Sequence, residues 1–395
     1  MTGTRDRVTL ATVVFAVLLA QVFLYPGIDT LVTALGAGTE LDASMWFLAA
    51  EFLAFVAFAG VWGAASDRAG RRTPFIAAGA LGGAVGYAAL AVLPGVVSLS
   101  FDAVLAVRVL QGAATVGAFS LAMTMLMDLE GGHGRNMAAA GAAIGGGTAL
   151  GAPLGGQLYE VGPFVPLWAA SALLAVAAGL TALVADRAPT DRDSLSAAVA
   201  GLRRTPALGL PYAFGFLDRL TAGFFALVGT LYFRQAFELD PGTTGLVLAL
   251  FFAPFALLQY PMGVLSDSVG RTVPIVVGSA LYGVGVIAVG QAPTVVLAGA
   301  GMFLVGVLGA LMAPATMALV TDLAGAGERG VAMGGFNVFG SLGFLAGVLV
   351  GGTVAGTHGY PAAFAVAGGL EVVVALVTVP VFLRLDPGRT ATFAD

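Results

Sequence analysis

The sequence predicts an all-α integral membrane protein in which twelve transmembrane helices form two pseudo-symmetric six-helix bundles. Three observations support this prediction. Hydrophobic residues make up 58% of the 395 positions and charged residues only 10%, and the mean hydropathy is +0.96, whereas about 25% of the residues in a soluble domain are charged. Apolar runs long enough to cross a bilayer recur along the chain, and its second half repeats landmarks of the first.

Each predicted span is an apolar run of about 20 residues, the length that crosses a hydrocarbon core, and it is bounded by charged, glycine or proline residues. Short proline-marked breaks at 160–163 and 291–293 are predicted to be hairpin loops. The twelve spans are expected at 8–34, 44–65, 74–94, 100–126, 137–158, 163–185, 207–233, 243–265, 274–291, 294–321, 331–355 and 359–383.

The arginines predict the orientation, because cytoplasmic loops carry an excess of positive charge. Fourteen of the seventeen arginines fall in the loops and tails on one side of the predicted spans, the side that holds both termini. Both termini are therefore expected in the cytoplasm, with the protein in the cytoplasmic membrane. A polar stretch over 186–206 is expected to be a cytoplasmic linker between an N-terminal bundle (1–185) and a C-terminal bundle (207–395).

An internal repeat relates the two halves. The stretch GAASDRAGRRTP from Gly63 has a fainter copy, GVLSDSVGRTVP, which begins 200 positions later. Asp128 and Asp322 lie 194 residues apart, and Gly151 and Gly347 lie 196 residues apart. Parallel repeats of this kind occur in transporters whose halves rock about a central site.

Over essentially its whole length the sequence resembles the major facilitator superfamily. In that family the loop between the second and third spans reads Gly, three residues, Asp-Arg, one residue, Gly-Arg and a further basic residue, and GAASDRAGRR matches it. The resemblance implies that this loop braces the two halves on the cytoplasmic side in the outward-open state. The residues concerned are Gly63, Asp67, Arg68, Gly70, Arg71, Arg72 and Asp128, with Asp267, Gly270 and Arg271 in the second copy.

In such a brace, Asp67 is expected to meet the positive N-terminal end of the eleventh span. Arg71 is expected to pair with Asp67 and Asp128. The alternative is that these arginines only satisfy the positive-inside rule. Asp67 favours the brace, because a carboxylate works against that rule.

Two further motifs resemble family signatures. In span four, Arg108 is followed, after two intervening residues, by Gln111 and Gly112. A buried arginine costs roughly 2.5 to 3.5 kcal/mol on insertion scales, so Arg108 is expected either to serve proton coupling or substrate binding, or to be a hydrogen-bonding strut. Span five resembles the signature of drug and proton antiporters, although its proline stands one place later and tight helix packing alone would also favour small residues. Its residues are Gly147, Gly151, Pro153, Gly155 and Gly156.

Charged residues inside predicted spans are candidates for function. Glu51 lies about 12 Å from its end of span two at 1.5 Å per residue, and Arg108 lies at a similar depth, so the two are expected to meet. Asp29 follows a Tyr-Pro-Gly break in span one and is either functional or merely interfacial.

The second half adds three such residues, Asp218, Arg219 and Glu371. Asp218 and Arg219 lie near the midplane of span seven. Neighbours on a helix point about 100° apart, so they are not expected simply to neutralise each other, and at least one is expected to face a cavity between the halves. Glu371 lies in span twelve, which is peripheral in the family, and is expected to make a structural hydrogen bond.

The leading hypothesis for function is a proton-coupled exporter, or antiporter, of small apolar or cationic compounds. The alternative is proton- or sodium-coupled uptake of a metabolite or sugar, although few polar residues are available to bind a sugar. A membrane sensor or enzyme is a remote alternative, because catalytic and nucleotide-binding motifs are missing from the sequence. The chain has no cysteine and only two histidines, His133 and His358. We expect no metal, no cofactor and no nucleic-acid partner, and we expect a monomer acting on a small molecule.

Overall fold

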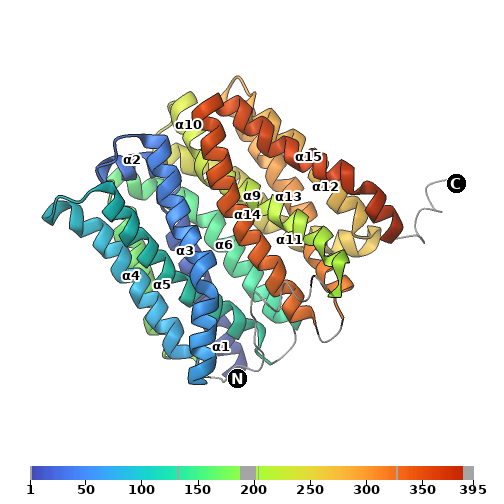
Figure 1. Cartoon of the computed structure of the whole chain (residues 1–395), viewed down its shortest axis with the longest axis horizontal. Helices are drawn as coiled ribbons and strands as arrows, with labels where there is room; N and C mark the ends of the chain where they lie inside the picture. The colour runs from blue at the N-terminus through green and yellow to red at the C-terminus, as the bar shows by residue number, and fades with distance from the viewer. Residues whose placement is uncertain (1, 131–132, 187–201, 203, 326–327, 386–395) are drawn as a thin grey trace.

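The computed structural model describes residues 2–130, 133–186, 202, 204–325 and 328–385, which form α-helices joined by short loops (Figure 1). The all-α class is confirmed. The first half contains α1 (Thr2–Val22), α2 (Ile28–Ala34), α3 (Glu40–Ala69), α4 (Thr73–Val96), α5 (Phe101–Met127), α6 (His133–Val161) and α7 (Val165–Thr181). The second half contains η1 (Pro206–Leu208), α9 (Gly209–Phe224), η2 (Phe225–Gly229), α10 (Thr230–Ala236), α11 (Pro241–Val269), α12 (Thr272–Gly290), α13 (Val295–Leu323), α14 (Arg329–His358) and α15 (Tyr360–Leu385).

Ten helices in the described residues are long and apolar enough to cross a membrane. One of them, Pro206–Ala236, joins η1, α9, η2 and α10. The other two predicted spans correspond to α7, an apolar helix of 17 residues, and to α1 with α2. The count of twelve spans and the side on which the termini lie therefore stay predictions.

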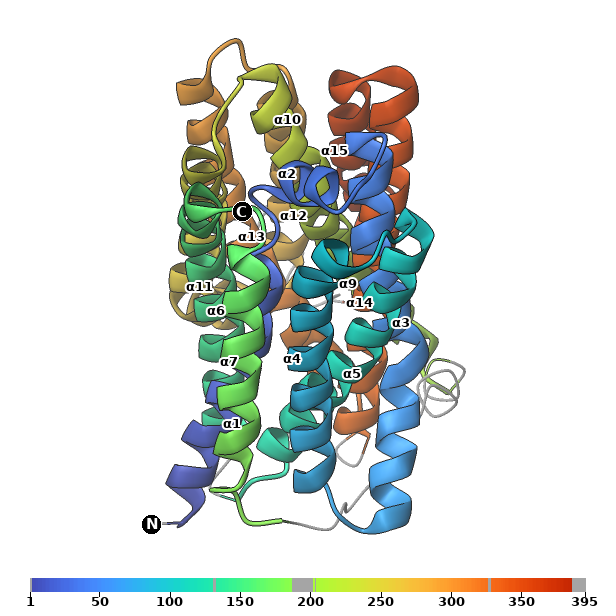
Figure 2. The ribbon, with the colours of Figure 1, turned by 90° about the vertical axis from the view of Figure 1, so that its left-hand side faces the viewer.

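The first predicted span, 8–34, is not one continuous helix. α1 ends at Val22 and α2 begins at Ile28, with Tyr25, Pro26 and Gly27 between them. Proline removes a backbone donor, which favours a break in the helix. A Cβ on Gly27 would lie 2.7 Å from the ring of Tyr159, so only glycine fits beneath that ring. α2 consequently runs in a different direction from α1 (Figure 2).

In both copies of the loop motif, a glycine with positive φ ends a long helix. Gly70 follows α3 with φ 62°, and Gly270 follows α11 with φ 86°. Residues with a Cβ rarely adopt positive φ, so this geometry explains why glycine occupies both positions.

The two halves lie side by side, with α3, α4 and α5 on the left of Figure 1 and α12, α13 and α15 on the right. We call the end of the bundle that holds α2 and α10 the closed side, and the end at which α1 begins the termini side. Across the halves, α6 packs against α11 and α3 against α14. The hydrogen bonds and ion pairs that join described residues of the two halves lie on the closed side.

Most of the predicted linker lies outside the described residues, namely 187–201 and 203, and so does the tail from 386. Arg187, Arg192, Arg203 and Arg389, which support the predicted orientation, belong to these segments.

Candidate functional site

An ion pair is buried inside the first half, between α3 and α5. Arg108 donates from Nη2 to Glu51 Oε2 at 2.6 Å, and both side chains are 0% exposed. Gln21 Nε2 on α1 lies 3.3 Å from the same oxygen, and the Tyr87 hydroxyl on α4 lies 3.4 Å from Oε1. The expected meeting of Glu51 and Arg108 is present, and four helices supply the polar groups around it.

Arg108 is held on both faces and along its own helix. Its guanidinium carbon lies 4.5 Å from the ring centroid of Phe47 and 5.5 Å from that of Tyr87. Nη1 donates to Gln111 Oε1 at 2.5 Å, and Gln111 donates onward to Thr115 Oγ1 at 2.7 Å. Nε is buried without a hydrogen-bond partner in the described part of the chain. One donor of this group is therefore free to bind an incoming acceptor.

Local packing explains why glycine follows Gln111 in the sequence. A Cβ on Gly112 would lie 3.0 Å from the backbone of Glu51, so the small residue lets α5 approach α3 at the level of the ion pair. Desolvation of two buried charges costs several kcal/mol per ion, and their attraction offsets this only with good geometry. Removing either partner therefore leaves an expensive buried charge.

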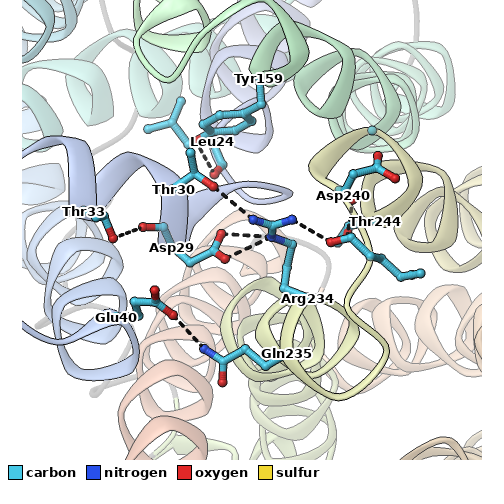
Figure 3. A network of polar contacts seen from close by, with 12 residues as sticks. Leu24, Asp29, Thr30, Thr33, Glu40, Tyr159, Arg234, Gln235, Asp240 and Thr244 are labelled. Atoms are coloured by element: carbon cyan, nitrogen blue, oxygen red, sulfur yellow. Dashed lines mark hydrogen bonds and ion pairs between the residues drawn. The ribbon is translucent and has the colours of Figure 1, made fainter.

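A second polar cluster joins the halves on the closed side (Figure 3). Arg234 on α10 donates from Nε to both carboxylate oxygens of Asp29 on α2, at 3.1 and 3.0 Å. Its Nη2 donates to Thr30 Oγ1 at 3.0 Å, and its Nη1 to the carbonyl of Leu239 at 2.6 Å. We call Asp29, Thr30 and Arg234 the closed-side latch.

Asp29 is 7% exposed and paired within the latch, and its role in transport stays a prediction. Arg234 was not singled out by sequence reasoning. Its signal in the sequence is its position, because it is an arginine at the end of a span and the loop that follows is otherwise acidic. Nearby, exposed Gln235 donates to Glu40 at 3.1 Å and the Gly242 N–H donates to Glu160 at 3.2 Å, which adds two polar links between the halves.

Aromatic and backbone contacts extend the closed side towards the middle of the bundle. Phe52 on α3 stacks on Phe344 of α14, with ring centroids 3.9 Å apart. A Cβ on Gly245 of α11 would lie 2.3 Å from the carbonyl oxygen of Ala152 on α6. Because Phe52 follows Glu51 in the chain, the buried ion pair lies close to the point where α3 meets α14.

The loop motif is not arranged as expected. Arg71 Nε donates to Asp186 at 2.9 Å, and it is Arg72 that pairs with Asp128. Asp67 makes no ion pair with another described residue. The expected pairs of Arg71 with Asp67 and Asp128, and the contact of Asp67 with α14, are not present among the described residues of this structure, and the brace expected for the outward-open state stays a prediction.

The physical reason is the placement of the contact between α3 and α14. The closed-side ends of these helices touch, as at Met45 and Gly352, whereas Asp67 lies at the opposite end of α3. Arg71 instead forms its ion pair within the first half, with Asp186. Desolvation raises the pKa of Asp186, but hydrogen bonds from the Thr73 N–H and from Arg71 outweigh it, so this pKa lies below its ordinary value.

The second copy of the motif does show the pairing pattern that was expected for the first. Arg271 donates from Nη1 to Asp267 at 2.5 Å and from Nε to Asp322 at 3.0 Å. Asp322 is the repeat equivalent of Asp128. Each half thus joins its own helix ends on the termini side.

The glycines of span five lie in α6 and face two neighbours. Gly147, Gly151 and Gly155 pack on α1; a Cβ on Gly155 would lie 2.4 Å from the carbonyl oxygen of Phe23. Gly156 faces the other half, where a Cβ would lie 2.4 Å from the carbonyl oxygen of Pro241. Pro153 is half-buried beside Gly245. Tight helix packing therefore explains this motif, and part of that packing is between the halves.

The charged residues of the second half lie away from the latch. Asp218 Oδ2 stands 3.9 Å from Arg219 Nε, so the expectation that these neighbours do not neutralise each other is only partly right. The Arg219 side chain is 43% exposed and that of Asp218 is 14% exposed. Glu371 on α15 is fully buried and accepts a hydrogen bond from Ser279 of α12, which is the structural bond that was expected.

Apolar helices in two halves, a charge pair buried inside one of them and contacts that close one end are the features expected of a membrane transport protein. The chain belongs to the Major Facilitator Superfamily, whose sequence profile matches residues 10–217 and 212–394. It is therefore a multi-pass integral membrane transporter.

Individual relatives agree with this assignment. The uncharacterized MFS-type transporter MJ1560 of Methanocaldococcus jannaschii is 30% identical over 179 residues. The match spans 43% of this chain and 43% of that relative, which is less than half of the relative's length.

Two solved structures share the fold over nearly the whole chain. The human organic anion transporter MFSD10 (TETRAN) matches with a TM-score of 0.69 and 21% identity, over 95% of this chain and 99% of that one. A mutant of the nucleoside transporter NupG matches with a TM-score of 0.75 and 15% identity, over 95% and 100%. At these identities the likeness concerns the fold alone.

Proposed function

We propose that this protein is a proton-coupled exporter of small apolar or cationic compounds that works by alternating access in the cytoplasmic membrane. The observation that carries the proposal is the Glu51–Arg108 pair, which is fully buried and adjoins the Phe52–Phe344 contact between the halves. An ionisable pair at such a depth is expensive and is a functional candidate. It lies where movement of the halves would change its surroundings.

In this mechanism a proton on Glu51 weakens its pairing with Arg108, and a cationic substrate competes with that proton for the same carboxylate. Binding of one therefore excludes the other, which is the requirement for exchange. For a neutral substrate, one proton crossing a potential of about 100 mV supplies about 2.3 kcal/mol, enough for roughly fifty-fold accumulation. One-for-one exchange of a proton with a monovalent cation moves no net charge, so the pH difference alone drives it.

The topology belongs to the proposal as well. We place both termini in the cytoplasm, with twelve spans in bundles over 1–185 and 207–395 joined by a linker over 186–206. The closed side then faces outward, and the structure corresponds to an inward-open form. Export rather than uptake is favoured by the glycines of α6, which resemble an antiporter signature and touch α11 at Gly156. An apolar substrate suits the aromatic contact at Phe52 and Phe344.

The test is transport by the purified full-length protein in liposomes, with an imposed pH gradient, a sodium gradient or neither. A panel of cationic, neutral and anionic dyes is offered, and Glu51→Gln is compared with Asp102→Asn, which removes an exposed carboxylate from the helix of Arg108. We expect movement of cationic and neutral dyes against the proton flux, lost in Glu51→Gln and kept in Asp102→Asn. Movement in the same direction as protons or sodium would instead establish coupled uptake and overturn the proposal.

A further inference from the structure

A second buried carboxyl group lies in the core of the other half, remote from Glu51. Glu371 on α15 is 0% exposed and contacts two hydroxyl groups. Ser279 on α12 donates to its Oε2 at 2.5 Å, and Thr221 on α9 lies 3.4 Å from its Oε1. Three helices therefore converge on one carboxyl group.

A third hydroxyl faces this cluster. The Tyr282 side chain on α12 is fully buried, and its hydroxyl makes no hydrogen bond of ordinary geometry in the described part of the chain, although it interacts with the Thr221 side chain. Its polar neighbours are Asp218, Glu371 and Thr221. A buried polar atom without an ordinary hydrogen bond is rare in folded proteins and calls for an explanation.

Charge balance around Glu371 is incomplete. On α9, Asp218 adds a second acidic group, and Arg219 lies 3.9 Å from Asp218 with 43% of its side chain exposed. On α12 the titratable neighbour is Tyr282. The third helix packed against α15 is α14, whose charged and titratable residues are Arg329 and His358 at its two ends.

Within the described residues, then, no cation pairs with Glu371. An isolated buried carboxylate costs several kcal/mol and in practice takes up a proton or binds a metal ion. A metal ion does not suit the present geometry. Among the described residues, no group of three or more His, Asp or Glu side chains is placed to hold a metal ion, and the Ser279 hydroxyl already bonds Glu371 Oε2.

We propose that Glu371 is a proton-binding site of the second half, which holds a proton among the hydroxyls of Ser279, Thr221 and Tyr282 and exchanges it with Asp218 through Thr221. This role in transport rests on the proposed proton coupling. The bound proton removes the uncompensated charge and gives the cluster one more donor for its oxygens.

The exchange path follows the face of α9. Asp218 lies three residues before Thr221, so both side chains are on one face of the helix, and Asp218 keeps 14% of its side chain exposed. In one step, the carboxyl proton of Asp218 passes to Thr221 Oγ1 while the original hydroxyl proton of Thr221 passes to Glu371 Oε1. The number of protons and the charge are conserved, and no oxidation or reduction occurs.

The experiment is infrared spectroscopy of the full-length protein in lipid nanodiscs at neutral pH. We expect a carbonyl band of a protonated carboxylic acid that is lost in Glu371→Gln, an isosteric change that can keep both hydrogen bonds. The band should stay in Asp218→Asn. In D₂O its deuterium shift should develop more slowly in Thr221→Val than in the unaltered protein, while the band itself remains.

Three results would overturn the proposal. The first is that the band is missing in the unaltered protein. The second is that it disappears in Asp218→Asn and not in Glu371→Gln. The third is that it vanishes when sodium chloride replaces choline chloride at constant ionic strength, which would make the cluster a sodium site. The spectrum does not depend on transport. A Glu371 band in a protein that moves no dye under a pH gradient would support this site and refute the proposed function instead.

Discussion

Removing Arg234 should open the closed side. Its charge is shared with Asp29 across the two halves, and their side chains are 16% and 10% exposed. Breaking a fully buried pair costs about 3 to 5 kcal/mol; we discount this to about 2 kcal/mol for partial exposure. Loss of the hydrogen bond to Thr30 adds about 1 kcal/mol. The sum, about 3 kcal/mol, corresponds to a shift of roughly 150-fold against the closed form.

A shift of this size is large enough to see in populations. A closed form that holds about 99% of the molecules would fall to roughly half of them. Because the chain has no cysteine, Thr39→Cys and Ala236→Cys can carry a pair of spin labels across the halves on the closed side. We expect the short-distance population in the pulsed electron resonance spectrum to shrink strongly in Arg234→Ala.

Gln235→Ala is the matched control. It removes an exposed hydrogen bond to the Glu40 carboxylate, and the one that Tyr360 donates, from the next residue of α10. Because these groups are exposed to solvent, we expect the loss to be at most about 1 kcal/mol. Its distance distribution should stay close to that of the parent protein. If Arg234→Ala folds normally and keeps the parent's short distance, the latch contributes nothing to closure and the reasoning is refuted.

Three further predictions concern other contacts. Arg108→Ala should lower the free energy of unfolding by about 3 to 5 kcal/mol, because Glu51 is left as an uncompensated buried charge. Adding Glu51→Gln should recover most of this loss, as measured by thermal unfolding. A double variant no more stable than Arg108→Ala would contradict this reasoning. Asp67→Asn should leave the melting temperature unchanged, since Asp67 makes no ion pair with another described residue. It should nevertheless slow the initial rate of transport at matched protein levels. A normal rate would exclude a bracing role for Asp67. Gly156→Ala should weaken closure in the spin-label experiment, because its Cβ would meet the backbone of α11, whereas Gly141→Ala on the same helix, with nothing within 4 Å, should behave like the parent.

The sequence was most informative about contacts inside one bundle. The meeting of Glu51 and Arg108 could be predicted because a helix rises 1.5 Å per residue, so the distance of each residue from its span end gives a common depth. Both side chains belong to the same half, and no assumption about the docking of the two halves was needed. The hydrogen bond of Glu371 also lies inside one half, but it was expected on a different ground, namely that the twelfth span is peripheral in the family.

Contacts between the halves could not be predicted in this way. The pair of Asp29 and Arg234 depends on which side is closed and on the break before α2, and the periodicity of apolar residues reports neither. The loop motif failed for a related reason. A family motif indicates that Asp67 and Arg71 have partners in some state, but the state determines which partners they have. The π-helix at Phe225–Gly229 also has no signal in an apolar run.

The contact between α6 and α11 has a kinetic consequence. Gly156 and Gly245 bring the two helices together backbone against backbone. Ordering a long side chain costs up to about 2 kcal/mol of rotamer entropy, whereas glycine has no rotamers to lose. This contact between α6 and α11, which we call the glycine seam, can therefore separate and re-form in every transport cycle without a search for the correct side-chain packing. The two glycine contacts themselves carry no charge, so salt should weaken the latch more than these contacts, although the Gly242 N–H between the same helices also bonds the charged Glu160. The rate of opening would then depend on ionic strength through Arg234, while the accuracy of reclosure would depend on the two glycines.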